Sequence, residues 1–131
     1  MKSIGLVTVG RSDYGIYFPL LRKIQSDPEL ELRLIVGGMH LSAEFGMTVK
    51  DIKDDGFEIA VRIEMSVPSD EPIGIAESIS CGVTGFARYY ARLRPDILVV
   101  LGDRFEMHSA ALAALPFKIP VAHIHGGELT E

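Results

Sequence analysis

The stretch LVVLGDRFEM, residues 98–107, begins as an unbroken apolar run and stops abruptly at Gly102, Asp103 and Arg104. An unbroken apolar run, as opposed to an alternating one, is typical of a central strand that is buried on both faces of a parallel sheet. A strand that ends on a glycine, an acid and an arginine presents polar groups at one edge of that sheet. The stretch therefore predicts a parallel sheet with a chemical site at its carboxyl edge.

The rest of the chain repeats this pattern, because short apolar runs alternate with helical patterns. Strands are expected at about residues 3–9, 31–36, 58–64, 96–101 and 120–124, and helices at about residues 14–26, 43–54, 73–93 and 105–115. Strands that alternate with helices indicate βαβ units. We expect an α/β fold, a Rossmann-like parallel sheet with helices on both faces. Since the chain stops shortly after the fifth strand, residues 1–131 are expected to be one part of a longer protein.

The composition narrows the class of protein. The 131 residues carry a net charge of -5 and are 47% hydrophobic, which suits one domain with a real core. No cluster of lysines and arginines is present, so a nucleic acid is not an expected partner. Because Cys81 is the single cysteine, an intramolecular disulfide is excluded. We expect Cys81 to be a residue of the long helix that packs against the protein interior. No apolar run reaches the roughly 18 residues of a membrane helix, and no signal peptide is recognisable, so we expect a cytoplasmic protein.

Polar residues follow four of the predicted strands, at the edge where open parallel sheets bind ligands. Glycines beside them allow a ligand to approach the backbone, and arginines suit a phosphate because the guanidinium binds two oxygens at once. The candidate residues are Arg11, Asp13, Tyr14, His40, Asp103, Arg104, Glu106, His123, His125 and Glu128.

Simpler roles remain open for several of these residues. Asp13 could cap the first helix, and Asp103 could cap the helix after the fourth strand with Arg104 as its surface partner. His123 lies between Ala122 and Ile124, and a buried, hydrogen-bonded histidine is the expected interpretation. The pair His123 and His125 is a weak metal signal, because no third ligand is evident, so no metal is expected.

Four segments carry a family resemblance. GRSDYG (10–15), GGMHLSAEFG (37–46), LVVLGDRFEM (98–107) and IPVAHIHGGELTE (119–131) resemble the hydrolysing UDP-N-acetylglucosamine 2-epimerases of sialic acid biosynthesis. More broadly, they resemble the UDP-sugar 2-epimerase superfamily, which has the two-domain glycosyltransferase-B architecture. The resemblance implies that residues 1–131 are a partial N-terminal Rossmann-like domain and that the C-terminal uridine-binding domain is absent from this chain.

The resemblance also implies a reaction. UDP leaves C1 of UDP-N-acetylglucosamine while the C2 proton is removed, which gives a 2-acetamidoglucal intermediate. Water then adds with the opposite configuration at C2 and releases N-acetylmannosamine. The family requires no cofactor. An acid/base set near C2 and cations near the diphosphate are what this chemistry needs.

By the same resemblance, Asp103 is the expected acid/base and Arg104 should orient it or contact the substrate. Arg11 matches an arginine near the diphosphate, and His40 is expected to face the sugar. The remaining predicted substrate-binding residues are Asp13, Tyr14 and Glu106.

One departure concerns His125, which stands where relatives often have a glutamate that is a catalytic candidate. Either His125 transfers the proton, which the pKa of an imidazole permits, or Glu128 does so.

Other functions remain open. The substrate could be a UDP-2,4-diacetamido-2,4,6-trideoxyhexose on the way to legionaminic acid. The chain could instead belong to a glycosyltransferase of the same architecture, or to a non-catalytic sugar-nucleotide binder. For the leading hypothesis we expect a UDP-sugar as the substrate partner, no membrane or nucleic-acid partner, a homo-oligomer in the full-length form, and no activity in the 131-residue chain alone.

Overall fold

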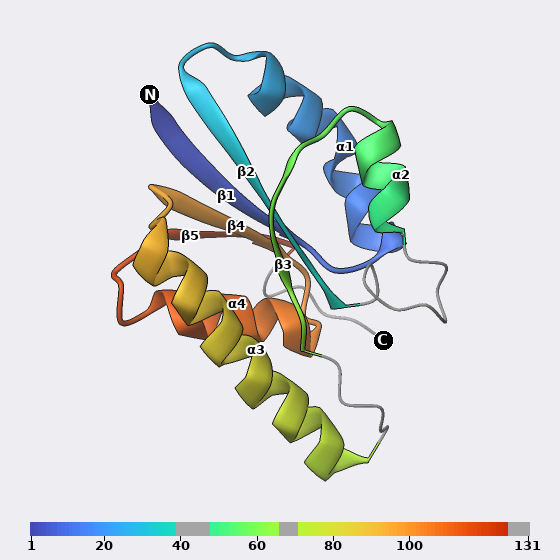
Figure 1. Ribbon diagram of the computed structural model, residues 1–131, viewed down its shortest axis with the longest axis vertical. Helices are drawn as coiled ribbons and strands as arrows, with labels where there is room; N and C mark the ends of the chain where they lie inside the picture. Colours follow the sequence, from blue (N-terminus) through green and yellow to red (C-terminus); the bar gives the residue numbers. More distant parts are fainter. Residues whose placement is uncertain (39–47, 66–70, 126–131) are drawn as a thin grey trace.

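The computed structural model describes residues 1–38, 48–65 and 71–125, in which strands and helices alternate along the chain (Figure 1). The elements are β1 (Lys2–Thr8), α1 (Arg11–Ser26), β2 (Leu30–Gly37), α2 (Val49–Asp54), β3 (Ile59–Ile63), α3 (Pro72–Arg92), β4 (Ile97–Leu101), α4 (Phe105–Ala114) and β5 (Val121–Ile124). The strands form one parallel sheet in the order β3-β2-β1-β4-β5. The predicted fold class is confirmed.

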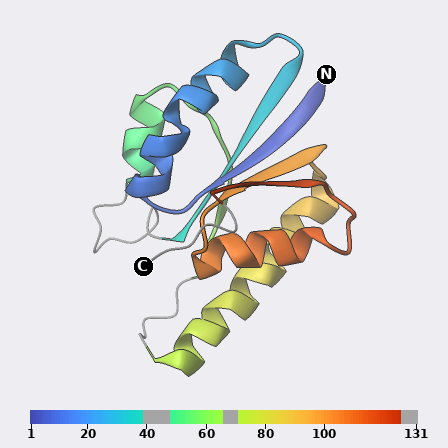
Figure 2. The same ribbon diagram turned by 180° about the vertical axis from the view of Figure 1, so that it is seen from behind.

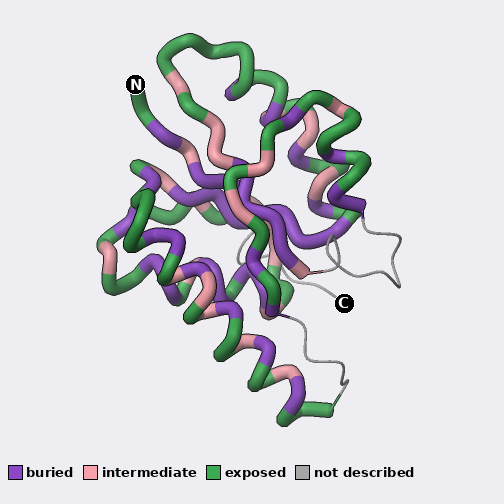
Figure 3. Tube along the Cα trace, in the orientation of Figure 1, coloured by how far each residue is buried: buried purple, intermediate pink, exposed green. Residues whose placement is uncertain are grey.

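The helices lie on both faces of the sheet. Helices α1 and α2 cover one face, and α3 and α4 pack together on the other, as the two opposite views show (Figures 1 and 2). The core follows the middle strands, where the buried trace concentrates (Figure 3). Leu6 and Val7 of β1 are fully buried, with Leu21 of α1 and Phe86 of α3. Central strands covered on both sides explain the unbroken apolar runs of the sequence.

The direction of the strand order changes between β1 and β4. From β1 the chain proceeds through α1 to β2 on one side, whereas β4 leads through α4 to β5 on the other. Open α/β sheets bind ligands at the carboxyl ends of the strands beside such a reversal. At the opposite end, the Ser3 amide donates to the Asp96 carboxylate over 2.7 Å, which joins β1 to the start of β4.

Helix α1 begins at Arg11, earlier than the sequence predicted. Gly10 has an extended backbone, and its amide donates to the Asp13 carboxylate over 2.9 Å. An acid in the first turn that binds the backbone in front of the helix fixes its start. The predicted helix at 43–54 is observed as α2, and residues 43–47 lie outside the described part of the chain.

Cys81 is exposed on α3, so the prediction that it packs in the interior is wrong. The inward positions of this helix are taken by Ser78, Gly82 and Phe86. Of the helices described, none combines the length and the apolar character needed to cross a membrane.

Candidate active site at the carboxyl edge of the sheet

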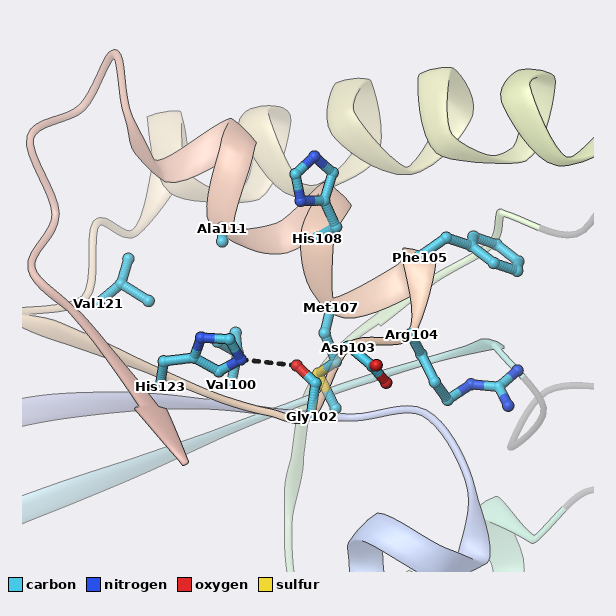
Figure 4. A pocket seen from close by; sticks show the side chains of 10 residues that line it. All are labelled: Val100, Gly102, Asp103, Arg104, Phe105, Met107, His108, Ala111, Val121 and His123. Atoms are coloured by element: carbon cyan, nitrogen blue, oxygen red, sulfur yellow. Dashed lines mark hydrogen bonds between the residues drawn. The ribbon is translucent and has the colours of Figure 1, made fainter. Parts of the chain in front are cut away.

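A cavity of about 460 Å³ opens at the carboxyl end of β4, between α4 and β5 (Figure 4). We call it the β4–α4 hollow. His108 comes from α4 and His123 from β5, and the Arg104 side chain points away from both. The lining residues are Val100, Gly102, Asp103, Arg104, Phe105, Met107, His108, Ala111, Val121 and His123. The hollow is therefore lined by both apolar and polar side chains.

Gly102 shapes the rim. Its φ of 76° is in the left-handed region, which favours glycine. Its amide donates to the Ile124 carbonyl over 2.9 Å, and its own carbonyl lies 2.6 Å from Nε2 of His123. Because a carbonyl only accepts, that nitrogen must carry the proton. Two hydrogen bonds thus join the turn at Gly102 to β5. Asp103 follows this turn and lines the hollow.

Asp103 is exposed, and its carboxylate makes no hydrogen bond within the described part of the chain. The N-cap position of α4 is occupied by Arg104 and not by Asp103, and no side chain makes a cap hydrogen bond there. The simpler role considered for Asp103, a helix cap with Arg104 as its partner, is therefore wrong. The exposed Asp103 is one of the residues that line the β4–α4 hollow.

Arg104 pairs with Glu106 instead. Its Nε lies 3.2 Å from one carboxylate oxygen of Glu106, and its Nη2 lies 3.0 Å from the other. The Glu106 side chain is 3% exposed, whereas that of Arg104 is 48% exposed. A buried acid and a half-exposed arginine are thus joined by a two-pronged ion pair at the start of α4.

Asp13 is buried at the end of β1. Its carboxylate accepts hydrogen bonds from the Thr8 hydroxyl, from the Val9 amide over 3.0 Å and from the Gly10 amide. Burial raises the pKa of Asp13, although these hydrogen bonds oppose the rise. This geometry favours the capping role that the sequence left open over direct contact with a substrate.

Arg11 and Tyr14 both contact α2 or the turn after it. Nη2 of Arg11 lies 3.4 Å from Asp51, and the Arg11 side chain is 73% exposed. The Tyr14 hydroxyl donates to Asp55 over 2.6 Å, and the ring packs edge-on against neighbouring phenylalanines. Burial raises the pKa of Tyr14. Arg11 is therefore accessible to a ligand. The hydroxyl of Tyr14 is already hydrogen-bonded to Asp55.

The histidines differ from expectation. His123 is exposed and lines the β4–α4 hollow, so the prediction of a core histidine is wrong; β5 is the edge strand of the sheet described here. His125 follows β5 with a φ of 58° and is exposed. His40 and Glu128 lie outside the described residues. Sequence reasoning missed His108, which lies inside α4 and lines the β4–α4 hollow.

Metal ligands do not gather in the described part of the chain. Within residues 1–38, 48–65 and 71–125, no three histidine, cysteine, aspartate or glutamate side chains form a group that could hold a metal ion.

Comparison with known proteins identifies the family. Residues 22–131 match the sequence profile described as UDP-N-acetylglucosamine 2-epimerase. The chain belongs to this family. The GDP/UDP-N,N'-diacetylbacillosamine 2-epimerase (hydrolyzing) of Campylobacter jejuni is a relative with 38% identity over 129 residues, which are 98% of this chain and 33% of that protein. The UDP-N-acetylglucosamine 2-epimerase of Neisseria meningitidis is 35% identical over 131 residues, which are 99% of this chain and 34% of that protein.

Solved structures of the 2-epimerase family share the fold. The crystal structure of the Neisseria meningitidis UDP-GlcNAc 2-epimerase bound to UDP-GlcNAc superposes with a TM-score of 0.80 at 20% identity. The superposition covers 99% of this chain and 33% of that one. The 2-epimerase chain described here therefore spans about a third of the length of its curated relatives. What it matches is the N-terminal part of the glycosyltransferase-B-like fold.

Proposed function

We propose that this chain forms part of a hydrolysing UDP-sugar 2-epimerase whose substrate is UDP-N-acetylglucosamine. The observation that carries the proposal is the Asp103 carboxylate, which stands exposed and without a partner in the described region, on the rim of the β4–α4 hollow beside Arg104. An unengaged acid next to a cation at the strand-order reversal suits proton transfer at a sugar that carries a diphosphate.

The proposed reaction consumes one water and gives N-acetylmannosamine and UDP. In the first step the bond between C1 and the UDP oxygen breaks, and the C2 proton goes to a base on the enzyme. In the second step water adds to C1 of the 2-acetamidoglucal, and a proton returns to C2 from the opposite face. Asp103 acts at the sugar, while Arg104 and Arg11 stabilise the charge of the departing UDP.

The second proton transfer needs a group on the other face of the sugar. The two candidates are His125, which follows β5, and Glu128, which stands three residues later in the sequence. We favour His125 by position. A comparison of His125→Ala with Glu128→Gln tests this choice, because the variant that loses turnover while still binding UDP identifies the group.

A second substrate is favoured by a specific observation. The Campylobacter jejuni relative, at 38% identity, is named for N,N'-diacetylbacillosamine, a 2,4-diacetamido-2,4,6-trideoxyhexose. The Neisseria meningitidis relative, at 35% identity, is named for UDP-N-acetylglucosamine. The chemistry at C1 and C2 is the same for both substrates, so the substituent at C4 and the presence or absence of the 6-hydroxyl distinguish them.

The deciding experiment follows the reaction in D₂O by NMR, with the complete gene product and each UDP-sugar in turn. A hydrolysing 2-epimerase releases UDP and a free sugar with inverted C2 that carries deuterium at that carbon. The better substrate is the one with the higher kcat/KM. Release of sugar without inversion or deuterium would reject the proposal, as would UDP binding with no turnover of either compound. A requirement for an acceptor would indicate a glycosyltransferase.

Three further proposals concern the complete protein: its second domain, its location and its oligomeric state. We propose that a C-terminal domain supplies the uridine contacts, since the relatives are about three times as long as this chain. We further propose that the enzyme acts in the cytoplasm as a homo-oligomer. Limited proteolysis and light scattering of the complete gene product test the domain and the oligomer.

A further inference from the structure

We propose that Glu106 is a positioning residue, which holds Arg104 so that the free edge of its guanidinium binds the diphosphate of the substrate. The sequence pattern predicted Glu106 as a residue that touches the substrate itself. The inference rests on the proposed function for the identity of the anion. The geometry that carries it is the two-pronged pair at the start of α4.

A guanidinium has two edges that can bind a pair of oxygens. In Arg104, Nε and Nη2 form one edge, and both are taken by the two oxygens of Glu106 at 3.2 Å and 3.0 Å. The other edge, formed by Nη1 and the second N–H of Nη2, makes no hydrogen bond in the described part of the chain. A second anion can therefore bind there without breaking the ion pair.

Glu106 itself cannot reach a ligand. Its side chain is 3% exposed, and one of its oxygens lies against Gly38, where an added Cβ would come within 3.0 Å. The same Cβ would also come within 3.0 Å of the Val9 side chain. The carboxylate is thus enclosed where the chain leaves β1, β2 and β4. Its place in the first turn of α4 also suits a negative charge, because helix N-termini are positive.

Arg104 is the better prepared of the two arginines at this edge. Its position is fixed by a buried carboxylate, and its side chain is still 48% exposed. Arg11 has one contact of 3.4 Å to an acid that is itself 57% exposed, and such surface pairs contribute little. A cation that is already fixed loses less conformational entropy when it binds an anion. Glu106 therefore acts on binding through Arg104.

A double-mutant cycle on the complete gene product tests this coupling, with UDP as the probe. Glu106→Gln, Arg104→Gln and the double variant are compared for the Kd of UDP by calorimetry, and for KM and kcat with the better UDP-sugar. The matched control is Glu31→Gln, which removes the acid of another Glu–Arg pair, with Arg33 at 3.3 Å, on β2. Thermal unfolding of each variant shows whether it still folds.

We expect Arg104→Gln to weaken UDP binding at least about tenfold, since it removes a charge-assisted pair of hydrogen bonds. Glu106→Gln should raise Kd and KM by about threefold to tenfold and change kcat less, because one amide oxygen still accepts from Arg104. The double variant should bind no more weakly than Arg104→Gln alone. Glu31→Gln should bind UDP like the wild type.

Two results would overturn the inference. One is a double variant whose fold-increase in Kd equals the product of the increases in the two single variants. The other is an Arg104→Gln variant that binds UDP normally. If a variant does not fold, the pairing of Arg104 with Glu106 is tested by NMR on the wild-type protein instead. The Nε–H of Arg104 should give an NMR signal protected from exchange with water, and a rapidly exchanging signal would contradict the pairing. UDP binding that follows the expected cycle without any turnover would reject the 2-epimerase function and leave the role of Glu106 intact.

Discussion

At the scale of single residues, Asp13 and Asp103 follow two neighbouring strands and have opposite environments. Asp13 is buried and accepts hydrogen bonds from the residues just before α1, whereas Asp103 is exposed and has no hydrogen-bond partner among the described residues. Two carboxylates placed so differently are suited to different tasks. Asp13 fixes the end of β1, and Asp103 is available for chemistry.

Substitution of Asp103 should therefore affect the reaction and leave the fold intact. We expect Asp103→Asn, in the complete gene product, to lower kcat at least about 100-fold, the low end for removal of a general acid or base. Its melting temperature should match that of the wild type. Steady-state assays of UDP release measure the first quantity and calorimetry the second. A near-normal kcat would remove Asp103 from the mechanism.

The matched substitution Asp13→Asn should show the reverse pattern. The asparagine side chain places an NH₂ group among three donors, so one buried donor loses its acceptor, which costs about 1–3 kcal/mol in the free energy of unfolding. Urea denaturation measures this loss. A variant with normal stability and a large loss of kcat would assign Asp13 to the substrate, as its position in the sequence suggested.

The residue scale also shows where sequence reasoning stops. The sequence predicted that the first helix starts near Tyr14, with Arg11 and Asp13 before it, but the helix begins at Arg11. Successive helical residues point about 100° apart. Consequently Asp13 turns into the protein and Tyr14 toward Asp55, and Arg11 stays accessible. Strand ends could be predicted from the sequence, whereas the direction of each side chain depended on a helix start that glycine and aspartate together fix.

At the scale of elements, the close approach of β2's end to α4 depends on Gly38. This residue has a φ of 58° and lies against both Glu106 and Val9. We expect Gly38→Ala to lower the free energy of unfolding by about 1–2 kcal/mol from the backbone alone. Because the methyl group also meets the Glu106 carboxylate, UDP binding should weaken with it. Urea denaturation and calorimetry measure the two effects.

Gly15 is the control for that substitution. It lies inside α1, and an added Cβ would meet no atom within 4 Å. Gly15→Ala should stabilise the protein by about 0.5–1 kcal/mol, because alanine loses less backbone freedom in a helix. Equal effects of the two substitutions would show that the space around Gly38 is not restrictive.

The hydrogen bond between Ser3 of β1 and Asp96 before β4 makes the free energy of unfolding depend on pH. The backbone hydrogen bond from Ser3 lowers the pKa of Asp96 below its usual 3.8, so the charged form is favoured in the folded state. The stabilisation is thus present above pH 4 and is lost as the pH falls through the lowered pKa. We expect Asp96→Asn to be less stable than the wild type at pH 7, with a smaller difference at pH 3. Urea midpoints at both pH values measure it, and a difference independent of pH would contradict it.

At the scale of the whole molecule, the chain covers about a third of each relative but contains a whole strand-order reversal. The alternation of apolar runs and helical patterns was sufficient to predict this sheet, because parallel strands need crossovers and crossovers need helices. The order of the strands was not predicted, since sequence spacing does not say on which side of β1 each new strand is added.

One prediction belongs to this scale. The 131-residue chain alone should release no detectable UDP from either UDP-sugar, because a site at the carboxyl edge of a single sheet is open to water on the side away from the strands. The complete gene product serves as the positive control under the same conditions. Deuterated N-acetylmannosamine formed by the 131-residue chain would show that one domain suffices.

The position of β1 has a consequence for synthesis on the ribosome. β1 is made first and lies at the centre of the sheet, but one of its two neighbours, β4, begins with a contact made 93 residues later. At about 5–20 residues per second, this interval lasts on the order of 5–20 seconds. During that time β1 can pair only with β2, and its other edge is an open template for strands of other chains. The nascent protein therefore has a window in which a chaperone that covers apolar segments would raise its yield.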